Sequence, residues 1–302
     1  MSITAAMVSE LRKKTGAGMM DCKKALSETG GNMDEAVDFL RKKGLSAAAK
    51  KSGRVAAEGA VTAAAEGTVG AVVEVNAETD FVAKNEAFQT FVSGVRNVIM
   101  ANNVADVEAL SALDYPGTGR TVAEELTHQI ATIGENMSIR RFQRVDVGQG
   151  VVSSYVHGAG KIGVLVELKT TATDERIEEL GKQLAMHVAA AAPQYLNRES
   201  VPAEVVEKEK EIMKVKALDS GKPENIVDKI ILGQINKYFG EVCLLEQAFV
   251  IDPDQKISQV VATLAKELGT EVSLSGFVRY QLGEGIEKKE DDFAAEVAAL
   301  SK

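Results

Sequence analysis

The sequence predicts an α+β fold made of several small parts. The N-terminal region carries apolar residues at helical spacing, whereas the chain beyond it alternates β-rich runs with helical runs. The run Val-Gly-Ala-Val-Val-Glu-Val at 69–75 is echoed by Ile-Gly-Val-Leu-Val-Glu-Leu at 162–168. Each run follows a glycine-containing turn and precedes a helix, so the order of elements repeats as well. We therefore expect two related halves, each a small antiparallel sheet backed by helices.

Residues 1–54 are expected to form a three-helix module and a linker. Three short amphipathic runs are separated by glycines, with stops at Gly16 and at Gly30. The third run begins at Asn32, which has a Glu three positions later as in a capping arrangement, and is expected to end at Gly44. The small, basic stretch 47–54 then fits a linker.

The first half of the core is expected over residues 55–146. Two β-rich runs, 57–64 and 69–76, flank a Glu-Gly dipeptide and predict a hairpin. A strand over 138–145 is expected to return to the same sheet. The turn-containing, polar stretch 102–127 is assigned no functional residue. The helix after the hairpin has one apolar face, formed by Phe88, Phe91, Val92, Val95 and Ile99.

The second half is expected over residues 147–286. Its main helix is predicted at 174–192, where Pro193 follows. Further strands are expected at 241–246 and 272–282. A short amphipathic helix then forms a C-terminal helical module, 287–302.

An insertion at about 200–239 interrupts the second half. It contains two charged helices, 202–219 and 223–239, joined by Ser-Gly-Lys. Their apolar seam is narrow and their other faces are mostly Lys and Glu. This pattern is typical of an antiparallel coiled-coil hairpin that projects from the body.

The composition favours a protein partner over nucleic acid. The net charge is −9 and the sequence pI is about 5.1, whereas nucleic-acid-binding domains usually show a basic footprint. Aromatic residues make up 5% of the chain and Trp is absent, which leaves little material for base stacking. No stretch reaches the ~18 apolar residues of a membrane span, and no signal peptide precedes the first helix. A cytoplasmic protein is expected.

The sequence offers no arrangement for covalent chemistry or metal binding. Cys22 and Cys243 lie far apart, and none of His128, His157 and His187 has a Cys or another His within four residues. The glycine-containing turns precede strands, whereas a phosphate-binding loop opens a helix. We therefore expect no enzymatic activity, no cofactor and no metal of its own.

Several segments resemble elongation factor Ts of bacteria, in the order expected for that family. The most specific are 11–26, LRKKTGAGMMDCKKAL, and 74–85, EVNAETDFVAKN. The others are His157-Gly158 and the stretches at 162–165, 220–223 and 283–287. The resemblance spans nearly the whole chain. It implies the architecture predicted above, with an N-terminal module of the ubiquitin-associated type.

The resemblance also implies a partner and a site. The partner is elongation factor Tu, a GTPase that holds GDP with a phosphate loop and Mg²⁺. In the family, a Thr-Asp-Phe-Val segment displaces that Mg²⁺ and promotes GDP release, so that GTP can bind. Here it falls on Thr79, Asp80, Phe81 and Val82. Further candidates for partner contact are Met19, Met20, His157 and Phe293. The two methionines fit the core of the helical module equally well.

Without the resemblance, the same segment predicts a structural role. Thr79 or Asp80 would cap the following helix, a position that both residue types favour. Phe81 lies seven positions before Phe88 and would share its buried face. With the resemblance, we expect Phe81 to be exposed.

Two other functions compete with nucleotide exchange. An adaptor that binds RNA or the ribosome would use the basic stretch 47–54 and the charged helices, but the acidic pI opposes it. An enzyme would need a cleft between the halves with convergent titratable groups, and no motif indicates one. The sequence favours an exchange factor.

Overall fold

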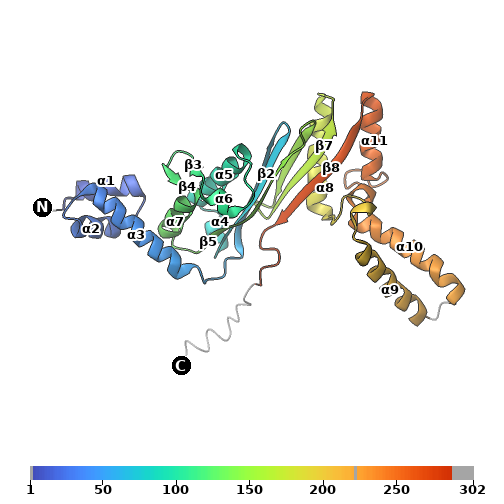
Figure 1. Ribbon diagram of the computed structural model, residues 1–302, viewed down its shortest axis with the longest axis horizontal. Coiled ribbons are helices and arrows are strands. Elements are labelled where there is room, and N and C mark those ends of the chain that lie inside the picture. The colour runs from blue at the N-terminus through green and yellow to red at the C-terminus, as the bar shows by residue number, and fades with distance from the viewer. Residues whose placement is uncertain (1–2, 221–222, 288–302) are drawn as a thin grey trace. The chain divides into compact units, whose positions relative to one another are not determined.

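The computed structural model describes residues 3–220 and 223–287 (Figure 1). Its helices and small antiparallel sheets confirm the α+β class. The chain divides into two compact units. Unit 1 comprises Met1–Thr62, Val73–Phe142 and Gln281–Lys302, and unit 2 comprises Ala63–Val72 and Gln143–Tyr280. The predicted C-terminal helix lies outside the described residues, and the predicted segment boundaries stay predictions.

Unit 1 begins with three helices: α1 (Ala5–Thr15), α2 (Met19–Glu28) and α3 (Met33–Lys51). Gly16 ends α1 with a φ of 68°, a left-handed conformation that costs glycine little. Asn32 caps α3, because its side-chain oxygen accepts the backbone N–H groups two and three positions later. The buried core of the three helices consists of Val8, Leu11, Cys22, Ala25, Leu26 and Ala36.

Helix α3 is longer than predicted, because Gly44 does not end it. A Cβ at Gly44 would lie 3.4 Å from the Cβ of Ala131, so this part of α3 packs against a second helix, α7 (Val122–Ile133). The alanines at 47–49, which favour helix, carry α3 onward. The prediction of a linker at 47–54 is therefore wrong for most of its length.

A three-stranded sheet follows, with the strand order β1-β2-β5. Its strands are β1 (Glu58–Glu66), β2 (Val69–Ala77) and β5 (Met137–Asp146). These bounds confirm the predicted hairpin and the return strand. Helix α5 (Glu86–Ala101) buries the predicted apolar face together with Val98.

The stretch 102–127 holds more regular structure than predicted. It contains α6 (Val107–Ser111), β3 (Asp114–Tyr115), β4 (Arg120–Thr121) and the start of α7. Helix α7 begins with a capping box, in which Thr121 and Glu124 each accept the other's backbone N–H. It ends at Gly134, with a φ of 92°. Both signals are local, so this helix was predictable from the sequence.

Unit 2 is built on a sheet with the strand order β6-β7-β8. Its strands are β6 (Val151–His157), β7 (Ile162–Thr170) and β8 (Val272–Gln281). The first two are antiparallel, in register from Val151 opposite Leu168 to His157 opposite Ile162. The two repeated runs of the sequence thus occupy β2 and β7, the central strands of the two sheets. This correspondence agrees with two related halves.

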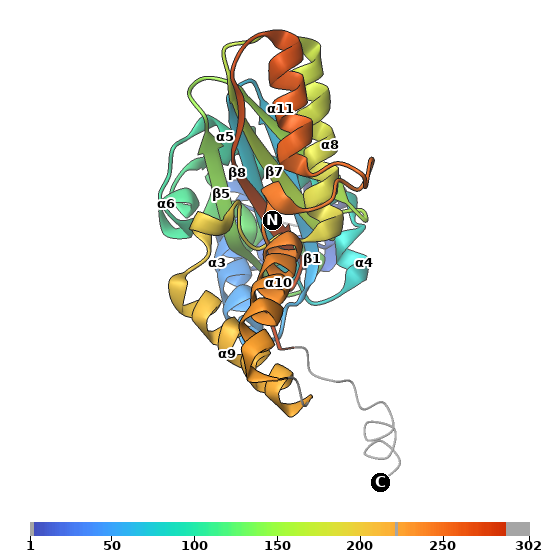
Figure 2. The same cartoon turned by 90° about the vertical axis from the view of Figure 1, so that its right-hand side faces the viewer.

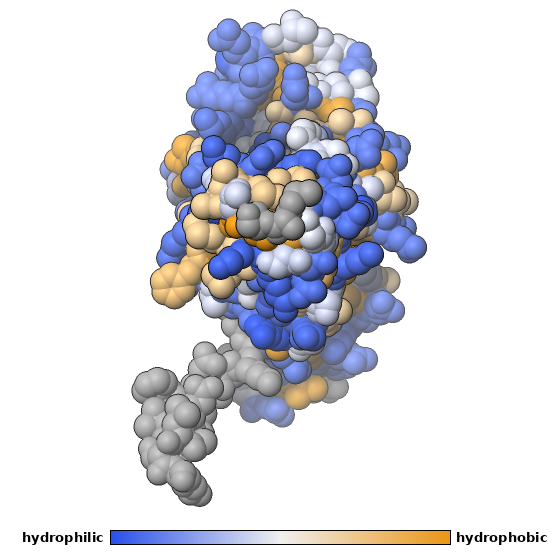
Figure 3. All heavy atoms as spheres, turned by 90° about the vertical axis from the view of Figure 1, so that its left-hand side faces the viewer, coloured by the Kyte–Doolittle hydropathy of each residue, from blue (hydrophilic) through white to orange (hydrophobic). Residues whose placement is uncertain are grey.

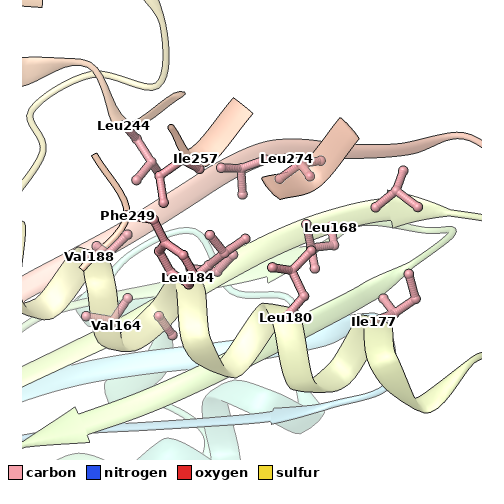
Figure 4. Packing of buried hydrophobic residues seen from close by; sticks show 14 of the residues in the cluster. Val164, Leu168, Ile177, Leu180, Leu184, Val188, Leu244, Phe249, Ile257 and Leu274 are labelled. Carbon is pink, nitrogen blue, oxygen red and sulfur yellow. The ribbon is translucent and has the colours of Figure 1, made fainter. Parts of the chain in front are cut away.

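Helix α8 (Glu175–Ala191) packs on β6 and β7, and α11 (Ile257–Leu268) packs beside α8 (Figure 2). Helix α8 confirms the predicted helix at 174–192, whereas α11 was not predicted. The core between these helices and the sheet is apolar (Figure 4). It includes Val164, Leu168, Ile177, Leu180, Leu184, Val188, Leu244, Phe249, Ile257 and Leu274.

The two charged helices of the insertion, α9 (Ala203–Asp219) and α10 (Glu224–Val242), pack on each other (Figure 1). The predicted strand at 241–246 is wrong, because α10 continues to Val242 and a 3₁₀ turn follows at Leu244–Glu246. A short apolar run does not distinguish a buried strand from a buried helix end. Among the described helices, none combines the length and apolar character needed to cross a membrane.

Candidate functional site

The residues at 79–82 form a tight turn of unit 1 between β2 and α5. The one-turn helix α4 (Asp80–Ala83) occupies most of this turn. Phe81 is 79% exposed, whereas its neighbour Val82 is only 6% exposed. The turn therefore presents one apolar side chain to solvent and buries the next. The exposure of Phe81 confirms the expectation drawn from the resemblance.

Phe81 escapes the buried face of α5 because α4 and α5 are separate helices. Asn85 caps α5, and its Oδ1 accepts the backbone N–H of Ala87 at 2.8 Å and that of Phe88 at 3.4 Å. The helix therefore starts anew after Lys84. The spacing of seven residues between Phe81 and Phe88 no longer describes one helical face, so the core position that it predicted is wrong.

Thr79 takes the N-cap position of α4 but does not cap it with its side chain. Its Oγ1 donates to Oε1 of Glu135 at 2.7 Å, and its backbone N–H donates to Oε2 of the same carboxylate at 3.0 Å. Asp80 is the first residue of α4. The capping role predicted for Thr79 or Asp80 is thus replaced by an attachment of Thr79 to a distant residue.

Lys84 lies close to both exposed side chains of the turn. Its Nζ is 2.9 Å from Oδ2 of Asp80 and 5.9 Å from the centroid of the Phe81 ring. The ion pair is exposed and contributes only ~0.3–0.5 kcal/mol, as is usual for such pairs on a helix. Its consequence is geometric, because the carboxylate and the ring are held near one cation.

The other candidate contact residues are also on the surface where they are described. Met19 is 59% and Met20 73% exposed, so both lie outside the core of the three helices. His157 is exposed at the end of β6, and its Nδ1 is 3.0 Å from the hydroxyl of Tyr155. Phe293 lies outside the described residues. Figure 3 shows one face of the molecule, on which apolar residues form scattered patches among hydrophilic ones.

The groups suited to metal binding or nucleophilic chemistry do not gather at this turn. Within residues 3–220 and 223–287, no three His, Cys, Asp or Glu side chains are arranged to hold a metal ion. Cys22 and Cys243 are both buried. His187 is fully buried, with Nε2 2.9 Å from Oε1 of Gln247.

Glu74 lies on β2, the central strand of the β1-β2-β5 sheet, and its carboxylate collects several hydrogen bonds. The sequence did not predict this role. Glu74 is fully buried, and Arg140 and Arg141 donate to its two oxygens at 3.0 and 2.6 Å. The backbone N–H of Gly283 adds a third bond at 2.8 Å. Burial acts to raise the pKa of Glu74, but the bonds from Gly283, Arg141 and Arg140 outweigh it and hold the pKa below its ordinary value. The carboxylate is therefore charged at neutral pH.

Comparison with known proteins gives one consistent result. A family model described as elongation factor TS matches residues 78–284. The elongation factor Ts of Syntrophotalea carbinolica is 69% identical over 303 residues, which cover 100% of both chains. That of Magnetococcus marinus is 61% identical over 300 residues, and that of Rhodospirillum rubrum 56% over 306, each covering 99% of both chains. The matched region includes the turn at 79–82.

Proposed function

Because this chain belongs to the elongation factor Ts family, we propose that it is a guanine-nucleotide exchange factor for elongation factor Tu in translation. The observation that carries this proposal at the level of the site is Phe81, an aromatic side chain 79% exposed on a turn that the rest of the structure holds in place. A large apolar side chain in solvent contributes little to folding, and within this family segment we assign it to contact with the partner.

The proposed mechanism uses the turn as a wedge. Phe81 enters the partner near its phosphate site, Asp80 acts beside it, and the Mg²⁺ that holds GDP is displaced. Thr79 and Val82 support the turn and do not contact the partner, because Thr79 is bonded to Glu135 and Val82 is buried. The Mg²⁺ and the nucleotide belong to the partner. This chain forms no covalent bond in the process and needs no cofactor.

Burial of Phe81 supplies less free energy than a large acceleration of GDP release requires. To accelerate release, the factor must bind the nucleotide-poor partner more tightly than the GDP-bound partner, and this coupling is reciprocal. A shift of about 10⁴ requires ~5.5 kcal/mol of differential affinity, whereas burial of one Phe supplies ~1.5–3 kcal/mol. We assign the remainder to a wider interface. Its candidates are the exposed Met19 and Met20, with His157 and Phe293 as further contacts.

The same proposal places the protein in the cytoplasm, where elongation takes place, with a protein rather than a nucleic acid as its direct partner. The test is release of labelled GDP from purified elongation factor Tu, followed with and without this protein. Acceleration at substoichiometric concentration supports exchange. An unchanged release rate contradicts the proposal.

A further inference from the structure

Glu135 lies between α7 and β5, far in sequence from the turn that it contacts. Its carboxylate accepts two hydrogen bonds from one residue, Thr79: the backbone N–H at 3.0 Å and the hydroxyl at 2.7 Å. Two bonds to one carboxylate fix both the position of Thr79 and the rotation of its side chain.

The neighbouring residues repeat the attachment in the opposite direction. Glu78 precedes Thr79, and its Oε1 accepts the backbone N–H of Asn136 at 2.5 Å. Asn136 is buried and donates through Nδ2 to the carbonyl of Arg54 at 2.7 Å. Arg54 in turn lies 3.3 Å from Oε1 of Glu78. The pairs Glu78-Thr79 and Glu135-Asn136 are therefore joined twice. The carboxylate of Glu135 accepts the N–H of Thr79, and the carboxylate of Glu78 accepts the N–H of Asn136.

This double attachment matters because α4 has little stability of its own. A helix of four residues forms a single turn, and the nucleation of one turn is unfavourable in isolation. The buried side chain within α4 is that of Val82. The orientation of Phe81 therefore depends on what holds the residues immediately before it.

We propose that Glu135 is a positioning residue for nucleotide exchange, which holds Thr79 so that Phe81 is presented in one orientation before the partner arrives. The inference rests on the proposed exchange function. We call the two bonds from Thr79 to Glu135 the clamp. Without it, the turn would become ordered only when the partner binds, and the conformational entropy lost at that moment would weaken binding. This entropy loss slows the step in which Phe81 enters the partner and Mg²⁺ is displaced, whereas the wider interface still forms.

The test compares three single variants in the GDP-release assay, across a range of factor concentrations. Glu135→Ala removes both bonds and is expected to lower the maximal release rate about tenfold, with the half-saturating concentration changed less than about threefold. Glu135→Gln offers one acceptor for the N–H and one donor for the hydroxyl of Thr79, so it should recover most of the rate. Thr79→Val removes only the hydroxyl bond and should give an intermediate loss, which keeps the test open if Glu135→Ala folds poorly.

Two further measurements separate positioning from general stability. In Glu135→Ala/Phe81→Ala, the loss should be no greater than in Phe81→Ala alone, because Glu135 acts through that ring. The chain has no Trp, so Phe81→Trp introduces a single indole, whose fluorescence anisotropy in the free protein should fall when Glu135→Ala is added.

Several outcomes overturn the proposal. They are wild-type release by folded Glu135→Ala or by Thr79→Val, additive losses in the double variant, or an unchanged indole anisotropy. The wild-type protein is measured alongside. If it fails to accelerate release, the proposed function fails, whereas an active wild type with an equally active Glu135→Ala sinks only the clamp.

Discussion

Arg141 donates from Nε to Oε2 of Glu74 across 2.6 Å, and the acceptor is completely buried. The bond joins β5 to β2, and Arg141 also lies 3.2 Å from the carboxylate of Glu284, which follows β8. Arg140, the backbone N–H of Gly283 and Nδ2 of Asn76 donate to the same carboxylate. One buried charge thus ties three stretches of unit 1 that are distant in sequence.

Glu74→Gln is expected to destabilise the protein strongly. The change removes the anion and leaves Arg140 and Arg141 facing a neutral amide, and the breaking of a buried pair typically costs ~3–5 kcal/mol of unfolding free energy. Urea unfolding followed by circular dichroism measures the loss. The control is Glu284→Gln, which removes an ion-pair partner of Arg141 that is 52% exposed and should cost less than ~1 kcal/mol. Equal losses in the two variants would show that burial of Glu74 is not what matters.

The free energy of unfolding should decrease as the pH falls from 7 to 5, partly because of His187. Burial lowers the pKa of His187, which in its neutral form accepts the N–H of Val250 at Nδ1 and faces Gln247 with Nε2. The unfolded chain therefore binds the proton first. The stabilisation is complete above the unfolded value of about 6.5 and is lost as the pH falls toward the folded pKa, at up to ~1.4 kcal/mol per pH unit.

His187→Gln should make this pH dependence shallower, as measured by urea unfolding at half-unit steps of pH. Part of the slope should remain, because burial and the nearby Arg120 also lower the pKa of His128. A His187→Gln protein with an unchanged slope would place the dependence elsewhere.

The helices and strands were predictable where their signals are local. Asn32 indicates the start of α3 because it is a favoured N-cap residue, and the helical spacing of apolar residues indicates the buried face of α5. Gly16 and Gly44 look alike in sequence, but only Gly16 takes a positive φ and ends its helix. Gly44 instead lies inside α3 and packs against α7, a contact that no local pattern reveals.

In the candidate site, too, some features could be predicted from the sequence and others depend on contacts between distant residues. The exposed Phe81 follows from the resemblance of its segment to a known family, because its spacing alone predicted a core residue. Glu135 lies 56 positions after Thr79, and Arg141 lies 67 after Glu74. Such contacts are set by which strands become neighbours in the sheet, so charge and spacing along the chain do not indicate them.

Shortening the charged hairpin should leave the rest of the protein folded. Helices α9 and α10 pack mainly on each other, and a small cluster at their base includes Val201, Val242 and Cys243. Replacing residues 208–234 by a short glycine linker keeps this cluster. We expect cooperative unfolding with a midpoint close to that of the full chain, measured by urea titration.

The matched control is a larger deletion, residues 201–238, which removes Val201 and Tyr238 from the base cluster. It should lower the unfolding midpoint, because Cys243 and Val242 lose buried apolar neighbours. If the shorter deletion abolished cooperative unfolding, the hairpin would be part of the core of unit 2 and not an appendage.

Phe81→Ala should separate stability from exchange. The side chain is 79% exposed, so its truncation removes little buried area and should change the free energy of unfolding by less than ~1 kcal/mol, against ~3–5 kcal/mol for a core Phe. In the GDP-release assay the same variant should lose more than about tenfold, the effect of a hot spot worth ~2 kcal/mol or more. Binding to elongation factor Tu should persist through the wider interface. Ile251→Ala, at a position 53% exposed in unit 2, is the control and should alter neither quantity. Normal exchange by a stably folded Phe81→Ala protein would remove the wedge from the mechanism.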